Sequence, residues 1–179
     1  MRVIAGSARG LPLVAPRDRR TRPISDRVKE AMFGSIGERV IDARVLDLYA
    51  GSGAIGIEAL SRGASHVTFV EHHRDALAAV RQNLERTGFI DRAAVHLADV
   101  AAFLAAADGP AWDIVILDPP YAERTLDLPL ERLSPHLAPT SLVVVKHFWR
   151  TPMPIRLELI PTRTRRFGET ALTFLERPT

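Results

Sequence analysis

The sequence contains no cysteine, which excludes disulfide bonds and metal sites built from thiolates. Its six histidines are scattered, and none lies in an H-E-x-x-H zinc motif. We interpret His72 and His73 as the start of a helix rather than a metal pair. No apolar run approaches the ~20 residues of a membrane span, and the first residues lack the apolar stretch of a signal peptide. We therefore expect a cytoplasmic protein that uses no metal and contacts no membrane.

Internal repeats, low-complexity segments and linkers are also absent. A length of 179 residues suits one compact unit with a full core, and 46% hydrophobic residues exclude a disordered chain. Short apolar runs alternate with helical patterns, which predicts an α/β fold with a mostly parallel sheet and helices on both faces. The predicted strands are 45–49, 67–70, 94–98, 114–117 and 142–145, with a terminal strand pair at 155–160 and 164–176, and the predicted helices lie near 26–36, 54–61, 74–87, 100–107 and 126–136.

A stiff acidic loop follows the fourth predicted strand. The apolar run 114–117 ends at Asp118, and Pro119, Pro120 and Tyr121 come next. Consecutive prolines fix the backbone and cannot donate hydrogen bonds, and α/β sheets bind ligands at the carboxyl ends of their strands. A carboxylate, a proline carbonyl and an aromatic ring can together hold a planar amine by its two N–H groups while its ring stacks on the tyrosine. We therefore predict that these four residues are catalytic; the alternative is a proline-rich turn without a function.

A glycine loop follows the first predicted strand. Gly51, Gly53 and Gly56 form the pattern G-x-G-x-x-G between a strand and a helix, and glycines let the backbone turn tightly and approach a ligand closely. The second strand ends at Glu71, 20 residues after Gly51, a distance typical of an acid that binds a ribose diol. The pattern predicts a nucleoside-containing ligand and fits both NAD and S-adenosylmethionine. The alternatives are a solvated strand end at Glu71 and a packing role for Gly56.

Two motifs of the sequence resemble motifs of methyltransferases. Asp47 stands four residues before Gly51, and this D-x-x-x-G-x-G arrangement resembles the first motif of class I methyltransferases. The Asp-Pro-Pro-Tyr loop resembles the catalytic motif of enzymes that methylate exocyclic amino groups of nucleobases. By this resemblance the cofactor is S-adenosylmethionine, and Asp47, Gly51 and Gly53 belong to its site. Glu71 is then expected to hold its ribose and Asp99, after the third strand, its adenine. Asp99 can also cap the next helix.

The resemblance narrows to the RsmD family, the bacterial 16S ribosomal RNA guanine-N(2) methyltransferases. Segments 2–10, 21–33, 47–63, 118–121 and 166–170 resemble that family in its order, over almost the whole chain. This implies a Rossmann-like class I methyltransferase fold with a seven-stranded sheet. It also implies methyl transfer to the amine of a specific guanine in 16S rRNA, within an assembled or partly assembled small ribosomal subunit.

The chain departs from the family pattern at a few positions. Leu11 stands where a second basic residue is usual, and Gly34 where Asn is common. The fifth strand ends in Lys146 and His147, where an acid is common. These differences concern the contacts with RNA more than the type of reaction.

Positive charge is concentrated at the N-terminus. Residues 1–30 carry eight basic and three acidic side chains, a net charge of +5, whereas the whole chain carries only +3. An excess of this kind suits contacts with RNA phosphates, and the alternative is a solvated charge run on a loop. The residues predicted to contact RNA are Arg9, Arg19, Arg20, Arg22, Asp26 and Arg27.

The predicted organisation is an N-terminal basic extension, 1–40, followed by a methyltransferase domain, 41–179. The extension is expected to contain a β-hairpin, 2–5 with 12–15, then the basic loop and a helix capped by Ser25. Three alternative functions remain open from the residues alone. They are an adenine or cytosine amino-methyltransferase acting on DNA or other RNA, a nicotinamide oxidoreductase, and an RNA-binding module without catalysis.

Overall fold

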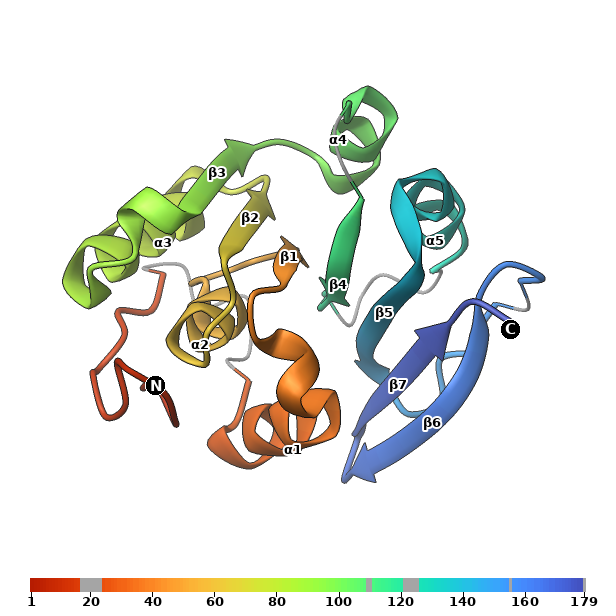
Figure 1. Cartoon of the computed structure of the whole chain (residues 1–179), viewed down its shortest axis with the longest axis horizontal. Coiled ribbons are helices and arrows are strands. Elements are labelled where there is room, and N and C mark those ends of the chain that lie inside the picture. Colours follow the sequence, from red (N-terminus) through yellow and green to blue (C-terminus); the bar gives the residue numbers. More distant parts are fainter. Residues whose placement is uncertain (17–23, 109–110, 121–125, 155, 179) are drawn as a thin grey trace.

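The computed structural model describes residues 1–16, 24–108, 111–120, 126–154 and 156–178. Seven strands form one sheet in the order β3-β2-β1-β4-β5-β7-β6 (Figure 1). The first five strands pair in parallel, and β7 is antiparallel to both of its neighbours, β5 and β6. This confirms the predicted mostly parallel sheet. The strands are β1 (Arg44–Leu48), β2 (His66–Glu71), β3 (Ala93–Leu97), β4 (Trp112–Leu117), β5 (Leu137–Phe148), β6 (Ile160–Phe167) and β7 (Thr170–Glu176).

Helices cover both faces of the sheet, because neighbouring strand residues point to opposite sides. Val45 belongs to one apolar cluster with α1, α2 and α3, whereas Leu46 belongs to a second cluster with α4 and α5. Figure 1 shows these two groups of helices on opposite sides of the strands. No helix within the described ranges is long and apolar enough to cross a membrane. The helices are α1 (Asp26–Ile36), α2 (Ala54–Ser61), α3 (Arg74–Thr87), α4 (Val100–Ala106) and α5 (Asp127–Leu133).

The terminal strand pair differs from its predicted bounds. The predicted division into 155–160 and 164–176 is wrong: the pair starts at Ile160, and its two-residue turn, Gly168 and Glu169, lies inside the second predicted strand. Gly168 has a φ of +62°, a conformation that such tight turns require and that glycine adopts without strain. Residues 156–159 do not pair, since Arg156 binds Asp127 on α5 instead. Tertiary contacts therefore override the apolar pattern there.

The N-terminal segment packs along α2. The predicted hairpin is reduced to one antiparallel bridge, Arg2 with Pro12, flanked by backbone hydrogen bonds. Its first arm is held by Glu58 of α2, whose carboxylate accepts the Ile4 and Ala5 amides at 2.8 and 3.0 Å. The turn of the hairpin lies at the C-terminal end of α2, where the Ser7 amide donates to the Ser61 carbonyl. The predicted N-cap of α1 is confirmed, since the Ser25 hydroxyl accepts the Val28 amide at 3.3 Å.

Candidate active site

Three carboxylates gather at the carboxyl edge of the central strands. Asp47 lies near the end of β1, Glu71 ends β2, and Asp118 follows β4. β1 pairs with both β2 and β4, so the sheet itself places the three acids side by side. The charges of Asp118 and Glu71 both act on Asp47. The sequence analysis placed Glu71 and Asp118 at strand ends and Asp47 within the first strand, and the strand order brings the three acids together.

Asp47 holds the end of the glycine loop through a buried hydrogen bond. Its side chain is fully buried, and its Oδ2 accepts the Gly56 amide of α2 at 2.9 Å. Its Oδ1 is buried without a hydrogen-bond partner in the described part of the chain. Burial raises the pKa of Asp47 well above its ordinary 3.8, and the charges of Asp118 and Glu71 add to that shift. The geometry makes Asp47 an anchor of the loop, while its predicted contact with the cofactor stays a prediction.

The backbone amides of the glycine loop, which a phosphate would need as donors, already donate hydrogen bonds within the protein. The Gly51 amide donates to Glu71 Oε2 at 2.9 Å, the Gly53 amide to the Ala50 carbonyl at 2.8 Å, and the Gly56 amide to Asp47. A dinucleotide fold instead offers such amides to the pyrophosphate at a helix N-terminus. Three carboxylates around this turn favour a cation over an anion, so the residues fit the sulfonium of S-adenosylmethionine better than NAD.

Gly53 and Gly56 are required for different reasons. Gly53, the N-cap of α2, has a φ of +77°, which places it in the left-handed region. At Gly56, an added Cβ would lie 2.3 Å from Cε1 of Phe69 on β2. The helix therefore packs directly on the sheet, and the proposed packing role for Gly56 is confirmed.

Glu71 is held as rigidly as the loop it supports. Its side chain is 5% exposed, and its second oxygen, Oε1, accepts the His73 amide at 2.8 Å. His73 is the N-cap residue of α3, which confirms that the histidine pair starts a helix. The side-chain atoms of Glu71, His72 and His73 that could bind a metal ion lie within 4.8 Å of one another. Because both Glu71 oxygens already accept backbone amides, its orientation is fixed for a polar ligand at the strand end.

Asp99 caps α4, as one of the two interpretations expected. Its Oδ1 accepts the Ala102 amide at 2.9 Å, and it follows β3, the strand next to β2. This contact leaves its second oxygen for a ligand beyond Glu71. The predicted contact with adenine stays a prediction.

Asp118 begins the predicted catalytic loop and pairs with a lysine. The register Leu117 with Val145 places Asp118 beside Lys146 of β5, and the Lys146 Nζ donates to Asp118 Oδ1 at 2.5 Å. The Asp118 side chain is 20% exposed and that of Lys146 8%. Burial raises the pKa of Asp118, and the Lys146 ammonium opposes that shift. Pro119 is buried and Pro120 exposed, whereas the predicted catalytic Tyr121 lies outside the described residues.

Two features of this edge were missed by the sequence analysis. Lys146 was noted only as a departure from a family pattern, because its partner depends on the register of two strands far apart in sequence. Tyr49, which follows β1, has a φ of +62°, an uncommon and strained conformation for a residue with a side chain. Strain of this kind concentrates at functional sites, and no local sequence signal predicts it.

Comparisons with known proteins agree with this geometry. A family model described as "Conserved hypothetical protein 95" matches residues 1–176. "Ribosomal RNA small subunit methyltransferase D" of Escherichia coli (strain K12) is 36% identical over 148 residues, which cover 82% of this chain and 74% of that protein. The protein of the same name from Haemophilus influenzae is 33% identical over 152 residues and covers 82% and 78%. The chain belongs to the RsmD family.

Solved structures extend the similarity of this RsmD family protein over its whole length. The structure of yhhF from Escherichia coli has a TM-score of 0.86 and 32% identity, covering 100% of this chain and 98% of that one. A hypothetical protein of Thermus thermophilus has a TM-score of 0.83 and 31% identity, covering 98% and 99%. The fold is therefore that of the class I methyltransferases, with the N-terminal segment included.

The predicted RNA contacts of this family member are not all in one place. Arg9 is exposed in the N-terminal turn, at the end of α2 opposite to the glycine loop. Eight helical residues, roughly 12 Å, separate it from that loop. Asp26 and Arg27 begin α1, where Asp26 pairs with Arg2 and Arg27 lies over Phe167. The remaining three predicted contacts, Arg19, Arg20 and Arg22, lie outside the described residues.

Proposed function

We propose that this protein transfers a methyl group from S-adenosylmethionine to the exocyclic amino group of a guanine in 16S rRNA of the small ribosomal subunit. The observation that carries the proposal is the position of Asp118. Its partly exposed carboxylate and the following Pro119 stand at the same sheet edge as the glycine loop and Glu71. The names of its relatives support rRNA as the substrate class.

A guanine amine is a poor nucleophile because its lone pair is delocalised into the ring. The Asp118 carboxylate and the Pro119 carbonyl accept its two hydrogens, which favours a pyramidal nitrogen with a localised lone pair. S-adenosylmethionine supplies an electrophilic methyl group when it is bound. Asp118 takes the proton that the amine loses, and Lys146 keeps the carboxylate charged and oriented beforehand. Catalysis rests on positioning and electrostatics, and the base must be unpaired or flipped out.

The proposal is tested by Asp118→Ala. We expect the methyl transfer rate to fall by on the order of 100-fold or more, because the variant lacks an oriented charged acceptor. Cofactor affinity, measured by titration calorimetry with S-adenosylmethionine, should stay nearly unchanged because Asp118 addresses the amine. Mass spectrometry of the wild-type product should find N2-methylguanosine. Methylated adenine or cytosine in its place would refute the guanine assignment, and near-wild-type turnover of the variant would refute the role of Asp118.

The cofactor site is tested by Glu71→Ala and Asp99→Ala. Each variant should bind S-adenosylmethionine about 1–3 kcal/mol more weakly, because a buried donor of the cofactor loses its acceptor. Asp91→Ala, which removes an acid from the surface near β3, serves as the control. If the titrations of the variants match the control, Glu71 only supports the glycine loop and Asp99 only caps α4.

A further inference from the structure

A tryptophan flanked by two arginines lies just beyond β5. The guanidinium of Arg166 is 3.7 Å from the centroid of the Trp149 ring, and that of Arg150 is 4.7 Å from it. Trp149 is half-buried, whereas both arginines are exposed. Cations over a tryptophan face are held by its electron-rich ring. We call these three residues the Trp149 clamp.

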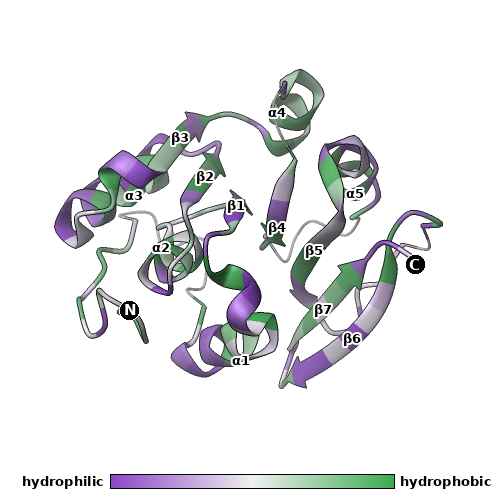
Figure 2. Ribbon diagram, in the orientation of Figure 1, coloured by the Kyte–Doolittle hydropathy of each residue, from purple (hydrophilic) through white to green (hydrophobic). Residues whose placement is uncertain are grey.

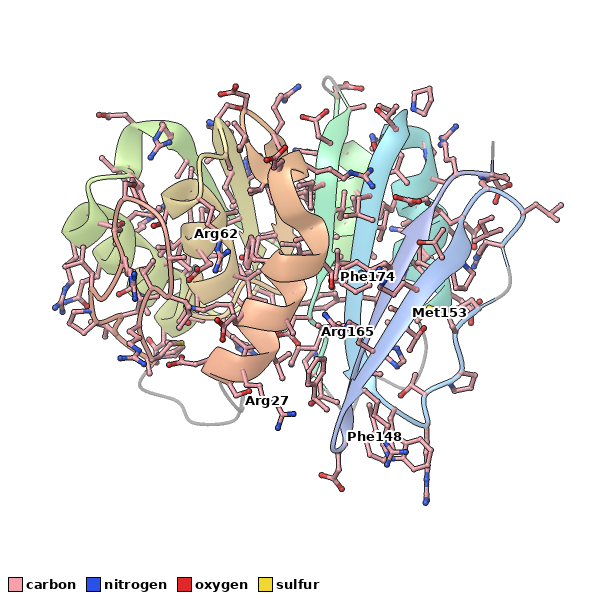
Figure 3. The ribbon with its side chains drawn as sticks, turned by 60° about the horizontal axis from the view of Figure 1, so that its bottom comes forward. Arg27, Arg62, Phe148, Met153, Arg165 and Phe174 are labelled. Atoms are coloured by element: carbon pink, nitrogen blue, oxygen red, sulfur yellow. The ribbon has the colours of Figure 1, made fainter. Side chains whose placement is uncertain are left out.

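The backbone fixes the Trp149 clamp next to the active-site edge. The Trp149 amide donates to the Glu169 carbonyl at 2.9 Å, and the Arg166 Nε donates to the Gly168 carbonyl at 2.8 Å. The β6–β7 turn and the end of β5 are thereby joined. Trp149 comes three residues after Lys146, a distance of roughly 10 Å along an extended chain. In Figure 3 the neighbouring Phe148 and Arg27 of α1 both lie along the lower edge of the molecule.

The Trp149 clamp carries a local excess of positive charge. Among the residues that the structure describes, neither Arg150 nor Arg166 forms an ion pair with an acid. Arg27 adds a further cation, lying 5.9 Å from the ring centroid of Phe167 at the end of β6. Figure 2 shows purple and white stretches along β6 beside the mostly green β7. The acid of this turn is Glu169. The exposed arginines Arg27, Arg150 and Arg166 lie beside the turn, and the exposed Arg163 and Arg165 lie further along β6.

We propose that the Trp149 clamp binds the phosphate backbone of single-stranded RNA beside the target nucleotide, with Trp149 as the positioning residue for the two arginines. The inference rests on the proposed function, which requires a guanine to be presented at Asp118. Stacking against the indole orders the two side chains before RNA arrives. The Arg166 Nε already donates to the Gly168 carbonyl, and the terminal NH2 groups of its guanidinium point away from that contact as donors for phosphate oxygens. The ring of the neighbouring Phe148, which is half-buried, also offers a face on which an unpaired base can stack.

An acidic protein surface has the same charge as RNA, but the composition of this edge favours RNA. Arginines that alternate with aromatic rings suit phosphates and bases together. The edge also continues into α1, whose sequence neighbour is the arginine-rich segment 17–22. Neither Arg150 nor Trp149 was among the residues predicted to contact RNA, because local sequence does not place them beside Arg166.

The test compares Arg150→Gln/Arg166→Gln with the control Arg81→Gln/Arg86→Gln. The control removes the same charge from exposed positions on α3, away from the clamp. Binding of a short fluorescein-labelled single-stranded RNA is followed by anisotropy over a series of KCl concentrations. We expect the clamp variant to lower the log–log salt slope by about 0.7 for each phosphate that it no longer binds, and the control to leave the slope unchanged. Titration calorimetry with S-adenosylmethionine should give wild-type affinity for both.

The outcomes distinguish failure of the clamp proposal from failure of the proposed function on which it rests. If the wild-type protein fails to bind S-adenosylmethionine, the proposed function fails. If the wild-type protein binds the cofactor, two results would refute the Trp149 clamp and leave the proposed function standing. In one, the clamp variant keeps the wild-type salt slope of RNA binding; in the other, the slope of the control variant falls as much as that of the clamp variant. Unchanged RNA binding together with loss of binding to ribosomal proteins would assign the surface to a protein partner instead. Trp149→Phe should retain more RNA binding than Trp149→Ala, and equal binding by these two variants would refute the positioning role.

Discussion

Asp118 and Lys146 occupy neighbouring strand ends on one face of the sheet, and their pairing decides the charge of the acceptor. Burial alone favours a protonated Asp118, which could accept fewer hydrogen bonds from an amine. The Lys146 ammonium opposes this effect and is itself nearly buried. A cation at this position therefore acts through Asp118 and need not touch the base.

Replacing Lys146 by Met should move the acidic limb of the pH–rate profile to higher pH. Without the ammonium, burial raises the pKa of Asp118 further, so the carboxylate forms only at a higher pH. Below the limb, kcat should fall about tenfold for each unit of pKa change. Lys146→Arg keeps the charge and is the control. If the acidic limb of the pH–rate profile of the Met variant lies at the wild-type pH, Lys146 has only a structural role.

Sequence reasoning succeeded for residues whose signals are local and failed for those whose partners are distant. The strand-end positions of Asp118 and Glu71 could be predicted from adjacent motifs. Lys146 could not be given a role, because its contact with Asp118 follows from the register of β4 and β5. The strained φ of Tyr49 likewise has no counterpart in the sequence.

At the scale of elements, the contact between α2 and β2 sets the position of the glycine loop. Gly56 allows the helix to pack closely on Phe69 and Val67, and the Gly56 amide also donates a hydrogen bond to Asp47. A shift of this helix would therefore disturb both the packing and the loop. Helix packing and the cofactor site share one residue.

Gly56→Ala should lower stability by about 1–3 kcal/mol, the usual cost of overpacking a core. Its Cβ would stand 2.3 Å from the Phe69 ring, so α2 must move outward. Binding of S-adenosylmethionine should weaken as well. Gly34→Ala in α1 is a matched control because nothing lies within 4 Å of its added Cβ, and alanine favours a helix. The measurement is chemical denaturation with and without cofactor; equal stability of the two variants would contradict the packing argument.

The elements themselves followed from the sequence where pattern and packing agreed. The observed α2 and α3 have their predicted bounds, and each predicted parallel strand exists. β5 runs far beyond its predicted apolar core because its ends pair with Trp112 of β4 and with β7. The terminal pair starts later than predicted, since Arg156 contacts α5. Contacts distant in sequence set these boundaries.

At the scale of the whole molecule, the N-terminal segment is attached to the cofactor side by buried polar contacts. Lys29 of α1 and Glu58 of α2 form an ion pair at 3.1 Å, with side chains 1% and 0% exposed. Asn83 of α3 donates to the carbonyls of Val14 and of Ser52 in the glycine loop. The residues on either side of the basic segment are thus anchored close to the cofactor loop and to α1.

This arrangement leaves little surface for reading an RNA sequence, which leads to a last prediction. Most of the chain builds one sheet with its helices, and phosphate contacts by arginines carry little sequence information. Selectivity must then come from how the substrate presents its base. A partly assembled small subunit can hold a loop guanine unstacked and remove a few kcal/mol of extrusion cost. We therefore expect faster methylation of small-subunit particles that lack the mark than of naked 16S RNA, measured as transfer of labelled methyl groups under matched salt. Asp118→Ala, inactive on both substrates, controls for contaminating activity. Equal rates on the two substrates would require a surface that reads sequence directly.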